Sequence, residues 1–115
     1  MTTAPAIDVA VLTRQLAHSR EAFGPGLRTE GILAHIAKEL EEIREKPTDL
    51  EEWADAVILS LNGALRVSEE LGLEPADVIT TVLNKLARNE LRTWPDWRTM
   101  DPNAPIEHDR TYGVQ

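Results

Sequence analysis

The chain has 115 residues, of which 12 are Lys or Arg and 20 are Asp or Glu, so its formal net charge is −8 at pH 7. This balance argues against a nucleic acid duplex as partner, because a duplex is bound through a basic face. The lack of cysteine excludes disulfides, thiol nucleophiles and cysteine zinc sites. The length suits one compact domain. The N-terminal residues do not show the basic segment followed by an apolar segment that is typical of a signal sequence, and no stretch of about eighteen uninterrupted apolar residues occurs. We therefore expect a cytoplasmic protein that does not enter a membrane.

The first half of the chain predicts two helices. Apolar residues at helical spacing indicate one helix over residues about 7–23, which the Gly-Pro-Gly segment at 24–26 ends. A second helix is expected over about 29–45, where Thr29 can cap the start and Pro47 prevents continuation. We interpret the Gly-Pro-Gly segment as a linker between helices, because no strand precedes it and the dinucleotide-binding fingerprint is absent.

The second half predicts two more helices. The third is expected over about 49–71, with Thr48 or Asp49 as its cap and Gly72 as its stop. The fourth is expected over about 75–93, with a proline at its first position.

The composition changes over residues 94–115, where three prolines in a dozen residues exclude a long helix. Trp94 and Trp97 lie in this segment, so we expect it to pack on the helices or on a neighbouring subunit. The predicted fold is therefore all-α, a single four-helix bundle with an irregular C-terminal tail rich in Trp and Pro.

Two copies of an acid-x-x-acid pattern flank the connector between the second and third helices, Glu39-x-x-Glu42 and Glu52-x-x-Asp55. Residues three apart lie roughly 60° apart around a helix, so both carboxylates of a pair can lean toward one point. Four converging carboxylates repel one another unless a cation lies among them, and an all-oxygen ligand set suits Mg²⁺ or Mn²⁺. The alternative is that the acids are solvated surface charge, as most helical acid pairs are.

A line of polar residues runs along the apolar third helix, formed by Asp55, Asn62 and Arg66 at i, i+7 and i+11. Apolar residues cover nearly the whole circumference of this helix, so we expect it to be buried on most sides. A polar line within a core usually marks a site, which favours a functional role for Asp55.

The fourth helix carries a line of Lys85, Asn89 and Arg92, whose donors could bind phosphate oxygens that extend from a metal ion. The alternative is a solvated basic face. On the second helix, His35 lies four residues before Glu39 on the same face and is a candidate base or ligand.

The chain resembles the MazG-like all-α nucleoside triphosphate pyrophosphohydrolases, and within them the small dATP/dGTP diphosphohydrolase branch, also called MazZ-like. The acid quartet resembles the signature of the wider family, and its surroundings narrow the resemblance to the branch. The resemblance extends over nearly all of the chain after about Ser19. It is carried by the segments Phe23-Gly24-Pro25-Gly26, Gly31-Ile32-x-x-His35-Ile36-x-Lys38-Glu39-Leu40-x-Glu42-Ile43, Asp49-Leu50-Glu51-Glu52-Trp53-x-Asp55, Lys85-x-x-x-Asn89-Glu90-x-Arg92-x-Trp94-Pro95-Asp96-Trp97-Arg98 and Ile106-Glu107-His108.

The resemblance implies an enzyme that hydrolyses a purine (deoxy)nucleoside triphosphate, of the dGTP or dATP type, to the monophosphate and pyrophosphate with Mg²⁺ or Mn²⁺. One of the acids would take the proton of the attacking water; Glu42 and Glu52 are the candidates, and Glu42 is favoured. The implied metal ligands are Glu39, Glu42, Glu52 and Asp55, and the implied substrate contacts are Lys85, Asn89, Arg92 and His35.

The resemblance also implies a homodimer or homotetramer, because so small a bundle builds its nucleotide pocket partly from a second subunit. Two alternatives stay open. The chain could be a non-catalytic helical module for dimerisation or regulation, or a related pyrophosphohydrolase that acts on another nucleotide such as phosphoribosyl-ATP.

Overall fold

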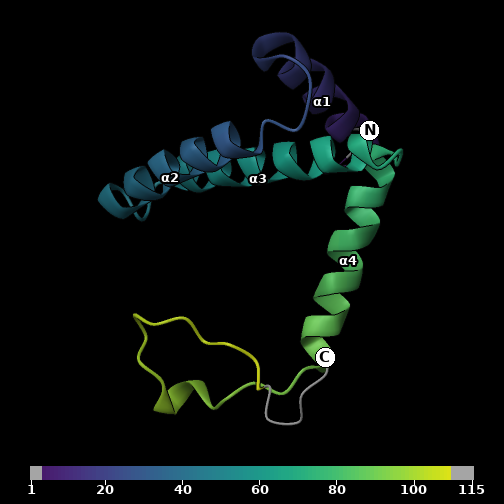
Figure 1. Ribbon diagram of the computed structural model, residues 1–115. Helices are drawn as coiled ribbons and strands as arrows, with labels where there is room; N and C mark the ends of the chain where they lie inside the picture. Colours follow the sequence, from purple (N-terminus) through teal and green to yellow (C-terminus); the bar gives the residue numbers. More distant parts are fainter. Residues whose placement is uncertain (1–3, 110–115) are drawn as a thin grey trace. The chain divides into compact units, whose positions relative to one another are not determined.

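The computed structural model describes residues 4–109. It contains the helices α1 (Val9–Phe23), α2 (Thr29–Glu45), α3 (Leu50–Glu70) and α4 (Pro75–Leu91) and the short 3₁₀ helix η1 (Trp97–Thr99), and no strand occurs within residues 4–109 (Figure 1). The prediction of an all-α fold with four helices is confirmed. Each helix begins and ends within two residues of its predicted bounds.

The chain divides into two compact units, one that ends at Thr80 and one that begins at Thr81, so α4 spans the division. The single domain expected from the length stays a prediction. Among the described residues, no helix is both long and apolar enough to cross a membrane. The expected cytoplasmic location is not tested by this observation.

Side-chain caps fix the starts of two helices. The Oδ1 atom of Asp8 accepts a hydrogen bond from the Val11 N–H at 3.0 Å, and Asp49 accepts one from Glu51 in the same way. The expected cap at Thr29 is wrong. Thr29 is already the first helical residue, and Arg28 precedes it in a left-handed conformation (φ 52°) with no side-chain cap bond.

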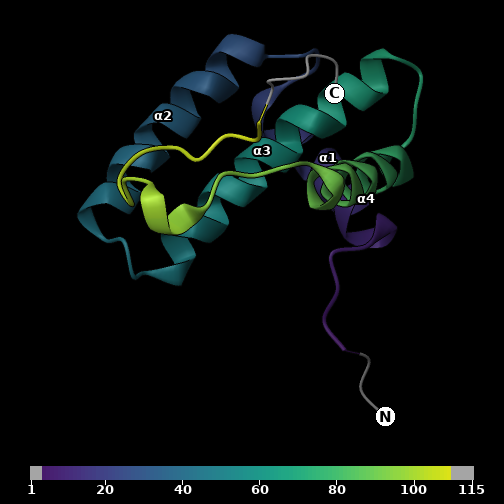
Figure 2. The same ribbon diagram turned by 90° about the horizontal axis from the view of Figure 1, so that it is seen from below.

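The core of the first unit is small. Leu12 of α1, Leu65 of α3 and Val78 at the start of α4 form its buried centre. Helices α2 and α3 lie side by side in both views (Figures 1 and 2), and α1 also packs on α3. At Gly63 of α3 a Cβ would lie 3.8 Å from the Ile32 side chain of α2, an ordinary van der Waals contact.

The expectation that α3 is buried on most sides is wrong. Trp53 and Val57 are each 49 % exposed, and Ile58 is 52 % exposed. The reason is geometric, because α1 and α2 each cover one side of α3 while its apolar residues occupy nearly the whole circumference. The first unit therefore keeps a large apolar surface on this helix.

Leu65→Ala is expected to lower the free energy of unfolding by about 2–5 kcal/mol, because Leu65 is 1 % exposed and its loss leaves a cavity. Leu50→Ala on the same helix is the control, since Leu50 is 80 % exposed. Urea unfolding followed by circular dichroism measures both, and equal effects of the two substitutions would contradict this core.

Candidate metal centre and adjoining cavity

A tight connector folds α3 back on α2. The Asp49 N–H donates to the Lys46 carbonyl at 3.0 Å, and the Trp53 indole N–H donates to the Pro47 carbonyl at 2.9 Å. These two bonds close the turn between the helices. As a result, the last two turns of α2 face the first two turns of α3.

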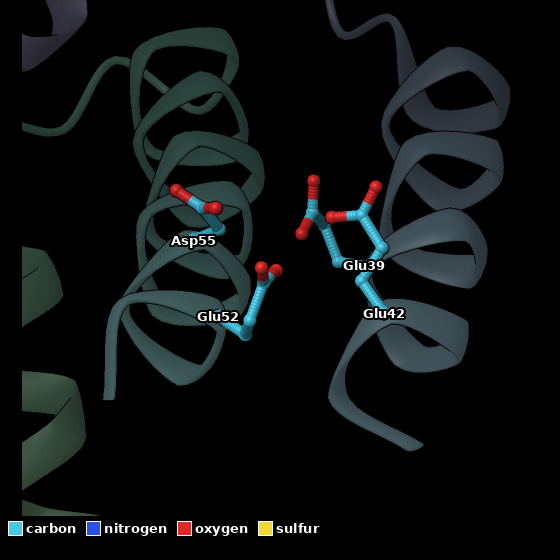
Figure 3. Close-up of side chains that lie close together, drawn as sticks. All are labelled: Glu39, Glu42, Glu52 and Asp55. Atoms are coloured by element: carbon cyan, nitrogen blue, oxygen red, sulfur yellow. The ribbon is translucent and has the colours of Figure 1, made fainter. Parts of the chain in front are cut away.

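The four acids converge across this helix pair. Each offers one carboxylate oxygen, and these four oxygens all lie within 4.8 Å of one another. Figure 3 shows the two side chains from α2 leaning toward the two from α3. Glu39 is buried, Glu52 is half-buried, and Glu42 and Asp55 are exposed. The predicted convergence is confirmed, whereas the role of these residues as metal ligands stays a prediction.

The cluster is electrostatically unsatisfied. One oxygen of Glu39 and one of Glu52, the Oε2 atom in each case, are buried without a hydrogen-bond partner. Within residues 4–109, the one ion-pair partner of the cluster is the His35 imidazole, which is charged only when protonated and whose Nε2 lies 3.7 Å from Glu39 Oε1. No Lys or Arg among these residues pairs with any of the four acids. Buried carboxylates of this kind need a positive partner.

The two acids that are at least half-buried, Glu39 and Glu52, also have raised pKa values. Burial, and then the neighbouring carboxyl of Glu42, raises the pKa of Glu39 above its ordinary value of 4.5. The pKa of Glu52 is raised by the same two causes in the same order. A hard divalent cation would relieve this repulsion and use the orphaned oxygens, so the donor set fits Mg²⁺ or Mn²⁺.

A cavity of about 250 Å³ adjoins the cluster, and Glu39 and Asp55 belong to its walls. Its remaining wall residues come from α1, α2 and α3, and all lie in the first unit. The apolar ones are Phe23, Ile58 and Leu59, and the polar ones are Gln15, His18, Ser19, His35 and Asn62.

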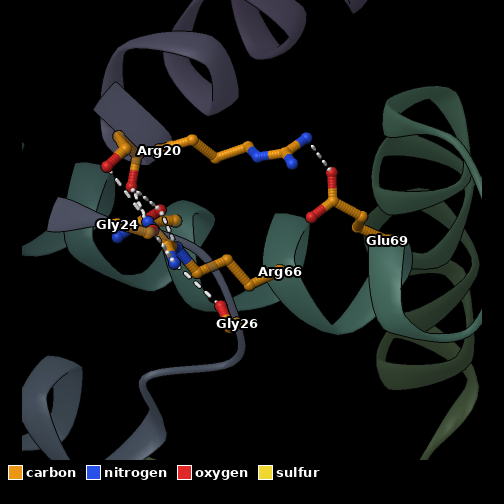
Figure 4. A network of polar contacts seen from close by, with 7 residues as sticks. Arg20, Gly24, Gly26, Arg66 and Glu69 are labelled. Carbon is orange, nitrogen blue, oxygen red and sulfur yellow. Dashed lines mark hydrogen bonds and ion pairs between the residues drawn. The ribbon is translucent and has the colours of Figure 1, made fainter. Parts of the chain in front are cut away.

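A buried arginine lies behind this wall. Arg66 is 2 % exposed, and its guanidinium donates to the carbonyls of Gly24 at 2.8 Å and Gly26 at 2.7 Å, and to the Ser19 carbonyl at 3.1 Å (Figure 4). Burial lowers the pKa of Arg66, but a guanidinium stays charged in proteins. Arg66 therefore ties the loop after α1 to α3.

The predicted polar line on α3 is thus divided among three tasks. Asp55 belongs to the acid cluster, Asn62 lines the cavity, and Arg66 holds the α1 loop from behind. Sequence reasoning missed Gln15 and Ser19, which also line the cavity. The available signal was that they are polar residues on the same face of α1 as Leu12 and Leu16.

The predicted phosphate contacts lie in the second unit. Arg92 Nη1 donates to Asn89 Oδ1 at 2.7 Å, and the Trp94 indole N–H donates to the Asn89 carbonyl at 2.8 Å. The Nε atom of Arg92 is buried without a partner, and Lys85 is exposed. Their action together with the acids stays a prediction. In the tail, His108 packs edge-on against Trp94 with ring centroids 5.8 Å apart; the tail residues 110–115 lie outside the described residues.

Comparison with protein families gives a match over residues 12–111, most of the chain, to a family model described as dATP/dGTP pyrophosphohydrolase. Comparison with curated proteins and with solved structures gives no match.

In metal-free protein at pH 7, Glu39→Gln is expected to raise the free energy of unfolding, because the amide removes a buried negative charge. The pKa of Glu39 is raised in the folded state, so the folded wild type holds more protons than the unfolded chain and loses stability as pH rises above 4.5. The difference in the free energy of unfolding between Glu39→Gln and the wild type should therefore vanish below pH 4.5. Thermal unfolding at a series of pH values measures this difference.

The same variant, Glu39→Gln, tests whether the acid cluster binds a divalent cation. Addition of MgCl₂ should raise the melting temperature of the wild type more than that of Glu39→Gln, because a ligand stabilises the state that binds it. Glu41→Gln is the matched control, since Glu41 is exposed on the same helix and pairs with Arg44. An equal magnesium effect in all three proteins would contradict a metal centre.

Proposed function

The chain belongs to the dATP/dGTP pyrophosphohydrolase family, and from this premise we propose that it hydrolyses dGTP or dATP to the nucleoside monophosphate and pyrophosphate in the presence of Mg²⁺. The observation that carries the proposal is the adjacency of two features. Four carboxylates with oxygens within 4.8 Å of one another lie beside a cavity of about 250 Å³, and Glu39 and Asp55 belong to both.

Glu39, Glu42, Glu52 and Asp55 would hold the cation. When bound, a divalent cation neutralises the phosphates and makes water more acidic. Of the four acids, Glu42 is the exposed member of the α2 pair, which supports its proposed role as the base that takes the proton of the attacking water. Glu52 is the other candidate base, and its half-buried position supports a ligand role instead. The water oxygen forms a bond to the α-phosphorus, the bond from that phosphorus to the oxygen bridging to the β-phosphate breaks, and pyrophosphate leaves with the bridging oxygen.

The cavity would hold the base and sugar. Its volume is slightly below the roughly 300–1,000 Å³ typical of pockets for drug-sized ligands, which suits a nucleoside with its phosphates outside. Phe23, Ile58 and Leu59 offer apolar contact for the faces of a base. With the nucleoside in the cavity, the phosphates would extend toward Glu39 and Asp55.

The phosphate oxygens also need hydrogen-bond donors, and we assign Lys85, Asn89, Arg92 and His35 to this role. His35 supports the assignment directly, because it lines the cavity and lies 3.7 Å from Glu39. Lys85 and Arg92 are supported by their chemistry, since an ammonium and a guanidinium are the usual donors to phosphate oxygens.

We also propose that the enzyme is a homodimer or homotetramer. About half of the surface of each of Trp53, Val57, Leu33 and Leu40 is exposed. Apolar side chains that lie together on a surface mark sites of contact with other proteins. A second apolar groove between α2 and α3, walled by Ile32, Leu33 and Val67 among others, extends this surface. A second copy of the chain would cover it.

The purified protein with Mg²⁺ is expected to release pyrophosphate from dGTP or dATP, and Asp55→Asn should lower kcat/KM by about a hundredfold or more, since even residues outside a metal's own ligands cost 10–100-fold. Glu51→Gln is the matched control, because it removes the same charge from the same helix outside the cluster. Chromatography of the products measures both, and circular dichroism checks folding. Activity of Asp55→Asn equal to that of the wild type would contradict the assignment of Asp55 as a metal ligand. If the wild type turned over no nucleotide in a panel that includes phosphoribosyl-ATP, the non-catalytic helical module would be the supported alternative.

A further inference from the structure

The side-chain amide of Asn62 has a fixed orientation. Asn62 Oδ1 accepts a hydrogen bond from the Ser19 hydroxyl at 2.6 Å and one from Arg66 Nε at 3.3 Å. A guanidinium has donors and no acceptor, so the amide atom that faces it must be the oxygen. The reversed amide would set two donors against each other.

Ser19 is fixed in the same way. Its hydroxyl oxygen accepts from Arg66 Nη2 at 2.8 Å, so the hydroxyl hydrogen is left to donate to Asn62. All three side chains are buried, with exposures of 3 % for Ser19, 5 % for Asn62 and 2 % for Arg66. Water therefore has little access to replace these bonds, and reversing the amide would leave a buried donor unpaired.

The consequence appears in the cavity, which Asn62 lines. Both hydrogen bonds of its amide use the oxygen, and no hydrogen bond described for residues 4–109 uses its nitrogen. The two N–H groups are thus the polar end that Asn62 has left for a ligand. Asn62 can therefore offer a donor pair to a ligand in this cavity, whose other lining residues include the apolar Phe23, Ile58 and Leu59.

We propose that Asn62 is a specificity-determining residue that selects guanine over adenine, with Ser19 and Arg66 as the positioning residues that hold its N–H groups toward the base. This inference rests on the proposed function, because it assigns the cavity to the base. Guanine presents two adjacent acceptors, O6 and N7, whereas adenine presents an acceptor at N7 and a donor amine at position 6. Guanine therefore pairs with the amide, and adenine leaves two donors facing each other.

A site built to hydrogen-bond one group rejects the analogue that cannot pair, because the buried partner is left unsatisfied. Wild-type kcat/KM should accordingly be about tenfold or more higher for dGTP than for dATP, the lower part of the range for a bidentate base contact. Deoxyinosine triphosphate keeps O6 and N7 and lacks the 2-amino group, so it should behave as dGTP does. This substrate shows whether the selectivity depends on the group at position 6 of the purine or on the 2-amino group of guanine.

Asn62→Asp is the decisive variant. One carboxylate oxygen can keep the bonds from Ser19 and Arg66, while the other replaces the donor pair with an acceptor that suits the adenine amine. The dGTP to dATP ratio of kcat/KM should fall by about tenfold or more and favour dATP. Asn103→Asp, an exposed position in the tail, adds the same charge and should leave the ratio unchanged. An active Asn62→Asp enzyme with the wild-type ratio would overturn the proposal, and so would a wild type that prefers dATP.

Two further measurements keep the test decisive. If circular dichroism shows that Asn62→Asp does not fold, Ser19→Ala replaces it; loss of the stronger of the two bonds to Oδ1 should move the ratio toward one, and an unchanged ratio counts against the proposal. If the wild type hydrolyses no nucleotide, the proposed function fails. Calorimetric binding of dGMP and dAMP then tests Asn62 by itself, with tighter binding of dGMP expected and equal binding contradictory.

Discussion

Mutual repulsion among four carboxylates is the constraint on which the rest of the site depends. The α2–α3 hairpin brings one oxygen of each acid within 4.8 Å of the others and buries Glu39 almost completely. Such a cluster costs free energy in the folded state, as the raised pKa values of Glu39 and Glu52 indicate. Within the described residues, the one side chain that pairs with the cluster is the imidazole of His35, which is charged only when protonated. A divalent cation bound at the cluster would offset this cost.

The hairpin that creates this cluster is held by local interactions. The Asp49 cap starts α3, and the Trp53 indole closes the turn on the Pro47 carbonyl. These contacts join residues that are near one another in sequence or lie on two adjacent helices. The acid cluster therefore does not require the exposed apolar residues of α3 to be covered, which leaves that surface available for a second copy of the chain.

The far wall of the cavity depends on longer connections. Arg66 links α3 to the Gly24 and Gly26 carbonyls, and Ser19 joins α1 to the same group. At the surface, Arg20 and Glu69 form a further ion pair between α1 and α3 at 2.7 Å (Figure 4). Within residues 4–109, the hydrogen-bond partners of the buried guanidinium are all neutral acceptors, so it holds the loop without pairing with the acid cluster. The cavity thus has a wall held by the buried guanidinium and, at Glu39 and Asp55, a wall shared with the acid cluster.

The sequence by itself determined the four helices and the convergence of Glu39, Glu42, Glu52 and Asp55, because helical periodicity, caps and i, i+3 spacing act over a few residues. It also indicated that the polar line of Asp55, Asn62 and Arg66 was functional. Only the tertiary structure decided that Ser19 and Gln15 belong to the cavity, that Arg66 faces carbonyls rather than acids, and which end of the Asn62 amide is free. Those facts depend on contacts between residues about 43 positions apart, such as Ser19 and Asn62, and no local pattern encodes them. The exposure of α3 was predicted wrongly for the same reason. The sequence shows how much of a helix's circumference is apolar, but only the packing of the other helices determines how much of it is covered.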